Sequence, residues 1–233
     1  MMNIDNTKPP LTDEELAEVN LKLGVRYLSL NMLATAKEKL DTAYEYDSNN
    51  ADVNNALGVL YERLDQDKQA LEYYKDALSL DDDNATIKNN YGRFLCERGD
   101  YQTGMVLLKQ ALAMPLNNRK WFTYTNVGVC EVNHGSQQLA EDNFRQALQI
   151  NRNYQPALLE MQKTSYRTGK YMSARAFLER YLAVANHTPE TLWYAVQTER
   201  ALGNQKLSEE YRDTMFRKFP TSKEAQQLKM IPR

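Results

Sequence analysis

The 233-residue chain carries 31 acidic and 29 basic side chains, and this near balance excludes a general attraction to nucleic acids. Only 9 glycines and 7 prolines are present, which disfavours loop-rich β folds and glycine-rich phosphate sites and favours an all-helical chain. No apolar stretch approaches the length of a membrane span, and the first fifteen residues lack the basic and apolar regions of a signal peptide.

The predicted elements begin with a helix near the N-terminus. Thr12 is followed three residues later by Glu15, which is the pattern of a capping box, so a helix is expected to begin there. Beyond this point a period of 34 residues runs along the chain. It is marked by a series of residue types that tolerate a left-handed turn conformation. The series is Asn31, Asp65, Gly99, Gly135, Gly169 and Gly203, with separations of 34, 34, 36, 34 and 34 residues.

The period divides the chain into an array of helix-turn-helix units. We expect an N-terminal extension with the start of the first helix in residues 1–16, six repeats in residues 17–222, and a capping segment in residues 223–233. The repeats are residues 17–50, 51–84, 85–120, 121–154, 155–188 and 189–222. The third repeat is two residues longer, so the 114–120 junction is expected to be a longer connection, either a tolerated insertion or a binding loop. Ser222–Ala225 is expected to begin a short capping helix.

Two columns of the repeat hold small residues. They are Gly24, Gly58, Gly92 and Gly128 in the first helix of a unit, and Ala36, Ala70, Ala140 and Ala174 in the second. Small side chains let the two helices approach closely. The pattern resembles the tetratricopeptide repeat, a 34-residue unit with small residues at positions 8 and 20. The resemblance implies an all-α fold, a right-handed superhelical solenoid of six such repeats.

No constellation of catalytic residues is found in the sequence. His134 and His187 fall at predicted turns without metal-ligand partners, and we expect both on the surface. Cys96 and Cys130 are expected on neighbouring first helices of the third and fourth repeats. The usual spacing of packed helices is larger than the Cα–Cα separation of a disulfide, so we predict two free thiols. We therefore expect no enzymatic activity, no cofactor and no metal.

A binding face is predicted on the first helices of the repeats, because positions 2, 5, 9, 12 and 13 line the concave surface in this architecture. The residues singled out are Leu21, Val25, Leu28, Asn55, Val59, Asn89 and Arg93. The apolar members predict a groove for an apolar peptide or an amphipathic helix of a protein partner. Alternatively, the N-terminal residues 1–16, with Ile4, Leu11 and Leu16, fold over this groove. A clamp for acidic chaperone C-termini is disfavoured, since Leu21 and Val25 replace its Lys and Asn.

Three segments resemble the type IV pilus biogenesis and stability proteins called PilF or PilW: residues 89–101, 113–116 and 150–161. The resemblance implies a pilotin, a lipoprotein on the periplasmic face of the outer membrane that helps the pilus secretin to localise and assemble, as pilus-driven twitching motility requires. The first cysteine is Cys96, inside a repeat, so the lipid anchor is expected to be missing from this chain. The alternative hypothesis is a general cytoplasmic tetratricopeptide adaptor that binds a peptide or helix of a partner protein.

Overall fold

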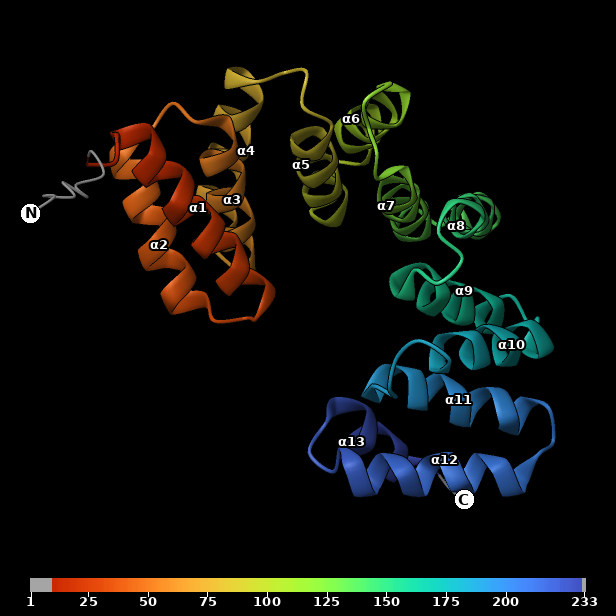
Figure 1. The fold of residues 1–233 in the computed structure, drawn as a ribbon. Coiled ribbons are helices and arrows are strands. Elements are labelled where there is room, and N and C mark those ends of the chain that lie inside the picture. The colour runs from red at the N-terminus through yellow and green to blue at the C-terminus, as the bar shows by residue number, and fades with distance from the viewer. Residues whose placement is uncertain (1–9, 232–233) are drawn as a thin grey trace, which may run out of the picture. The chain divides into compact units, whose positions relative to one another are not determined.

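The computed structural model describes residues 10–231, and every regular element in that range is an α-helix (Figure 1). The chain divides into two compact units, residues 1–116 and 117–233. Within each unit, successive helices form antiparallel pairs that pack on the neighbouring pair. This is the all-α tetratricopeptide-type solenoid that the period predicts.

The first unit holds six described helices. They are α1 (Asp13–Ser29), α2 (Leu33–Tyr46), α3 (Ala51–Arg63), α4 (Asp67–Leu80), α5 (Ala85–Glu97) and α6 (Tyr101–Ala113). The capping box at the start of α1 is confirmed: the Thr12 hydroxyl accepts from the Glu15 amide at 3.2 Å, and the Thr12 amide donates to the Glu15 carboxylate at 2.8 Å. Helix α1 therefore begins where the sequence indicates.

The second unit holds the other described helices. They are α7 (Lys120–Asn133), α8 (Gln137–Ile150), α9 (Gln155–Arg167), α10 (Tyr171–Leu182), α11 (Pro189–Ala201), α12 (Gln205–Lys218) and α13 (Lys223–Met230). Helix α13 is the short helix predicted at the C-terminus. It is capped by the Ser222 hydroxyl, which accepts from the Ala225 amide at 3.1 Å, and it packs on α11 and α12. The predicted longer connection is also present, as residues 114–119 between α6 and α7.

The six predicted turn residues all have a left-handed backbone. Asn31 and Asp65 have φ of 56°, and the four glycines that follow at the same point of the repeat have φ between 73° and 94°. In this region a Cβ atom is strained, so glycine, asparagine and aspartate are the residue types that fit. The turn between the helices of a pair was thus correctly predicted at each of these positions.

Helices of one pair approach closely where the small residues lie. A Cβ atom added at Gly58 would lie 2.7 Å from the Tyr74 ring, and one added at Gly128 would lie 2.4 Å from the Phe144 ring. The four alanines of the second column, Ala36, Ala70, Ala140 and Ala174, are fully buried. Larger residues at these points would hold the helices of a pair apart.

The first helices of the pairs lie on the inner side of each unit. In the first unit, the backbones of α1, α3 and α5 lie side by side, whereas those of α2, α4 and α6 stay farther apart. The second unit shows the same difference between α7, α9, α11 and α8, α10, α12. Each unit therefore curves toward the side on which its first helices lie. The positions of the first helices that point away from the second helices form the inner, concave face of the unit.

Two expectations about single residues are wrong. Cys96 and Cys130 are both disulfide-bonded rather than free thiols. The expectation was based on the usual spacing of helix axes, a quantity that does not fix the separation of any two Cα atoms. His134 is exposed as expected, but His187 is half-buried because its ring packs edge-on against Tyr211, with 5.7 Å between centroids.

Candidate partner-binding surface

The candidate site is the inner face of the first unit, formed by α1, α3 and α5. One column of this face carries position 9 of each repeat: Val25 on α1, Val59 on α3 and Arg93 on α5. Val25 is 48% exposed. Val59 is half-buried and packs on the cores of its own and the following repeat. The apolar part of this column is therefore open to a partner mainly at Val25.

Other residues predicted for the binding face are less accessible. Leu28 is 4% exposed and belongs to the core between the first two repeats, and Leu21 packs half-buried against the same core. Asn55 and Asn89 are both buried, the latter to 2% exposure. The exposed surface is accordingly smaller than the predicted set of seven residues.

The buried asparagines are joined across two repeats by Asn90, which is not among the seven predicted residues. The Asn90 amide donates to the Asn55 side-chain oxygen at 3.1 Å, and the Asn89 amide donates to the Asn90 side-chain oxygen at 3.4 Å. Buried amides require such partners. Asn55 and Asn89 thus join α3 to α5 and act in packing between repeats.

Arg93 is held by Glu62 of the preceding repeat. Its two terminal nitrogens donate to the two carboxylate oxygens of Glu62 at 2.6 and 2.7 Å, and one of them also donates to Glu97 at 3.0 Å. Burial disfavours the charged guanidinium, but the hydrogen bonds and charge of Glu62 outweigh it and raise the pKa of Arg93. The bidentate geometry fixes the Arg93 side chain on the inner face.

Tyr74 completes this network from the second helix of its repeat. Its hydroxyl donates to Glu62 at 2.9 Å, and its ring is fully buried. Burial, and then the charge of Glu62, raises the pKa of Tyr74 well above its usual value, so the phenol remains a donor. Neither Glu62 nor Tyr74 is among the seven residues predicted for the binding face.

A spacing signal was available for these contacts. Glu62 and Arg93 are 31 residues apart, and so are Asp67 and Arg98, which form a second bidentate pair at 2.7 and 2.8 Å. Opposite charges separated by slightly less than one repeat therefore mark ion pairs between neighbouring repeats in this chain.

The inner face of the first unit combines an open apolar position with fixed polar neighbours. Arg63 donates to the Leu28 carbonyl at 2.5 Å and so joins the ends of α3 and α1. Because Arg93 and Glu62 pair with each other, these two charges are not free for a partner, whereas Val25 offers exposed apolar surface for van der Waals contacts. Among residues 10–231, no group of three or more His, Cys, Asp or Glu side chains is placed to hold a metal ion.

None of the helices within the described part of the chain is both long and apolar enough to cross a membrane.

Helix pairs with small residues at their contacts and left-handed turns between them are the architecture of a tetratricopeptide-type solenoid. The sequence matches the family described as Tetratricopeptide repeat over residues 51–84, which is the second expected repeat. Curated protein sequences gave no match. Such repeats are scaffolds for protein–protein interaction, and no catalytic family is indicated.

Two solved structures resemble the chain over nearly its whole length. PilF from Pseudomonas aeruginosa is 27% identical, with a TM-score of 0.76, and the match covers 94% of this chain and 98% of that one. PilW, described as a widely conserved type IV pilus biogenesis factor, is 26% identical, with a TM-score of 0.81 and coverage of 92% and 98%. YrrB, described as a tetratricopeptide protein with an unusual peptide-binding site, is 19% identical, with a TM-score of 0.57 and coverage of 82% and 98%, and shares the fold alone.

Proposed function

We propose that this chain is a pilotin-type scaffold for type IV pilus assembly, which binds the outer-membrane secretin and promotes its localisation and oligomerisation. The observation that carries the proposal is the end-to-end similarity to PilF and PilW, each covered to 98% at 26–27% identity. The identity of 26–27% distinguishes these two proteins from YrrB, which is covered to the same extent but is only 19% identical. The proposal includes the division of residues 17–222 into six repeats.

The proposed location is the periplasmic face of the outer membrane, with attachment through a lipid anchor. The state of the cysteines supports a periplasmic location. Cys96 and Cys130 are both disulfide-bonded, and disulfides persist in oxidising compartments such as the periplasm but are rare in the cytosol. This also disfavours the alternative of a cytoplasmic adaptor.

We place the secretin contact on the inner face of the first unit, around Val25. Leu21 and Val59 flank it as half-buried apolar residues, and Arg93 is fixed at the far end of the same face by Glu62. An apolar side chain of the partner would cover Val25 and exclude water from it, which is the main source of affinity available here. Leu28, Asn55 and Asn89 support this surface from within.

The test measures binding of the purified periplasmic domains of the secretin to three forms of the protein. Val25→Asp is expected to weaken binding by about tenfold or more, because the interface would have to desolvate a carboxylate. Val106→Asp is the matched control, since Val106 is a valine of similar exposure, 54%, on α6 of the same unit. It should bind within about twofold of the unchanged protein.

Circular dichroism must show that both variants are folded. Equal binding by the Val25→Asp variant and the unchanged protein would move the contact away from the inner face. Absence of secretin binding by the unchanged protein would refute the proposed function itself.

A further inference from the structure

The first helix of the array, α1, carries an exposed apolar stripe. Val19 and Leu23 are 45% and 40% exposed, and their spacing of four residues places them side by side on one face of the helix. Of the 14 large apolar side chains that are exposed in residues 10–231, six lie between residues 11 and 32. Exposed apolar surface is therefore concentrated at the start of the array.

The same two positions are buried in other repeats. Val19 and Leu23 occupy positions 3 and 7 of the first repeat. In the second, third, fifth and sixth expected repeats, the first helix packs there on the second helix of the preceding pair. The equivalent residues are Val53, Ile87, Ala157 and Thr191 at position 3, and Leu57, Tyr91, Met161 and Ala195 at position 7, all with an exposure of 7% or less. The stripe on α1 is thus the contact surface of a repeat without a preceding pair.

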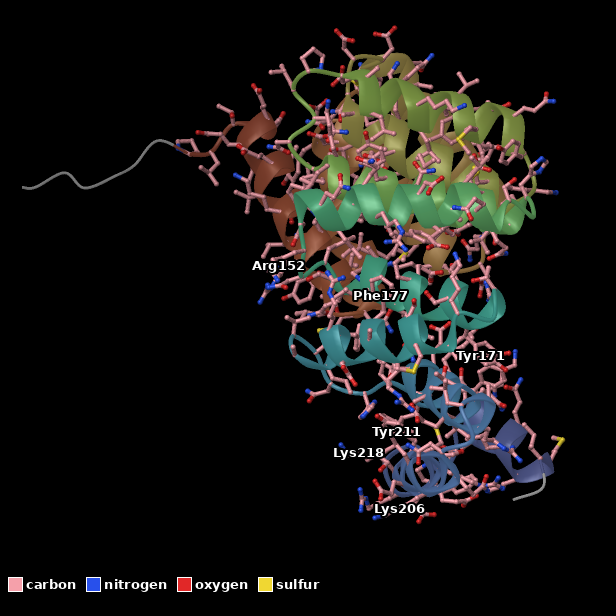
Figure 2. All side chains as sticks on the ribbon, turned by 90° about the vertical axis from the view of Figure 1, so that its right-hand side faces the viewer. Arg152, Tyr171, Phe177, Lys206, Tyr211 and Lys218 are labelled. Atoms are coloured by element: carbon pink, nitrogen blue, oxygen red, sulfur yellow. The ribbon has the colours of Figure 1, made fainter. Side chains whose placement is uncertain are left out.

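The end of a solenoid that faces water normally carries polar residues. At the C-terminal end, α13 closes the array, because its Ala225 and Leu228 are fully buried in one cluster with Leu192 and Met215. No described helix precedes α1. Figure 2 shows side chains at the red, N-terminal end of the first unit pointing away from the other helices of that unit. An apolar stripe at an open end is consistent with a docking surface.

Charged residues of opposite sign border this stripe. Glu15 lies one turn before Val19, and Arg26 lies one turn after Leu23. Arg26 is exposed and forms no ion pair within residues 10–231. Glu15 is also exposed, and its hydrogen bonds to the Thr12 amide and hydroxyl both involve Oε2, so Oε1 is open. The stripe is therefore acidic at one end, apolar in the middle and basic at the other end.

We propose that this stripe binds a second copy of the chain, with the two α1 helices antiparallel. A symmetric dimer uses the same patch twice, so the patch must match its own reversed copy. Pairing about position 21 sets Val19 of each copy against Leu23 of the other, because each lies two residues from that position. Arg26 lies five residues after position 21 and Glu15 six before it, so the two charges come within about 1.5 Å of each other along the helix axis.

The rest of the stripe fits the antiparallel arrangement. Leu30, nine residues after position 21, would lie near Leu11 of the other copy, ten residues before that position, and both are 53% exposed. The two Lys22 side chains approach each other near the midpoint, but each is already paired with Glu18 at 2.6 Å. A parallel pairing would instead bring like charges together at both ends of the stripe, which is unfavourable.

The dimer surface differs from the proposed secretin contact. Val25 lies two residues after Leu23 and therefore on another side of α1. One helix from each copy gives a small interface, so the dimer is expected to be reversible, with a Kd in the micromolar range.

The test is sedimentation equilibrium of the full chain over a concentration series that spans the micromolar range. Arg26→Glu sets two carboxylates against each other at both ends of the dimer and should weaken it by about tenfold or more. The exchange Glu15→Arg/Arg26→Glu restores opposite charges and should recover the affinity to within about threefold of the unchanged protein. A monomer throughout the series, or an exchange variant as weak as Arg26→Glu, would overturn the proposal.

Leu23→Asp tests the apolar centre and should abolish the dimer, because two carboxylates would have to be desolvated there. The matched control is Leu139→Asp on α8, an exposed leucine of another repeat with 52% exposure, which should dimerise within about twofold of the unchanged protein. Equal loss in both variants would refute the assignment of the surface. Circular dichroism must show that each variant is folded.

A photoreactive benzophenone amino acid in place of Val19 identifies the occupant directly. Irradiation should give a covalent dimer with the cross-link on α1 of the other copy. A cross-link to residues 1–9 within one chain would overturn the proposal in favour of the chain's own N-terminal segment. A cross-link to added periplasmic domains of the secretin, in place of the dimer, would overturn it in favour of that partner. Val25 is unchanged in all these variants, so secretin binding, measured separately, distinguishes failure of this inference from failure of the proposed function.

Discussion

Gly58→Ala is the sharpest test of the packing described for the helix pairs. The new Cβ atom would lie 2.7 Å from Cδ1, 2.8 Å from Cε1 and 3.0 Å from Cγ of Tyr74. Ordinary contact begins at 3.4 Å, so the ring or the helix must move by the difference between 3.4 and 2.7 Å, which is 0.7 Å. The ring has little room, because it is fully buried and packs on Tyr91 and Phe94 at 5.7 and 5.3 Å between centroids.

Three contributions set the magnitude. Overpacking of this kind costs about 1–3 kcal/mol, and displacement of the Tyr74 hydroxyl from Glu62 weakens a hydrogen bond to a charged group worth about 1.5–3 kcal/mol. The higher helix propensity of alanine relative to glycine offsets about 1 kcal/mol of this cost. We therefore expect Gly58→Ala to lower the free energy of unfolding by about 2 kcal/mol, measured by urea titration followed by circular dichroism.

Repeating the substitution in a Tyr74→Ala background tests whether contact with the Tyr74 ring causes the loss of stability. In Tyr74→Ala the ring is absent, so Gly58→Ala should there be stabilising by up to about 1 kcal/mol. Tyr74→Ala alone costs about 3–5 kcal/mol, and the pair should be compared in a stabilising osmolyte. If Gly58→Ala destabilises both backgrounds equally, steric contact with Tyr74 is not the cause and the reasoning is refuted.

Three further predictions concern a buried carboxylate, a turn and the cysteines. Burial favours protonation of Glu141, but hydrogen bonds from Lys170 and a neighbouring arginine outweigh it and lower its pKa below the ordinary 4.5. Because the folded pKa is the lower one, this stability is present above about pH 4.5 and is lost as pH falls through the folded pKa, so the urea midpoints of Glu141→Gln and the unchanged protein should converge in acid. Gly99→Ala should cost about 1–2 kcal/mol in thermal or urea unfolding, because φ is 91° although the space is open, and unchanged stability would contradict the left-handed turn. Thiol titration of unfolded protein without reductant should detect no free Cys96 or Cys130, and a signal equal to that of reduced protein would contradict the bonded state.

The periodic features of the fold were predictable from the sequence because they repeat. A turn such as that at Asp65 needs a residue that tolerates positive φ, and this requirement recurs every repeat, so the residue types reveal it. The helix bounds follow from the turns. The same argument fails for Cys96, whose bonding depends on one local separation that no repeat position determines.

The binding face was predictable only in part. Repeat position assigns a side chain to a face of its helix, but it does not say how far the neighbouring helix covers that face. Leu28 and Asn89 lie in the expected columns and are nevertheless buried, whereas Val25 in the first repeat is open. The Arg93–Glu62 pair depends on two residues of different repeats, so reading each column separately could not find it.

The contacts between neighbouring helix pairs also affect how the chain can fold while it is being synthesised. Among the described helices of each unit, a helix packs only on its own partner and on helices of the adjacent pairs, so none of them depends on a described segment synthesised much later. Folding from local contacts is fast and exposes little apolar surface for long. A chain that emerges from its N-terminus, whether from a ribosome or a translocation pore, can therefore fold pair by pair in the order of emergence.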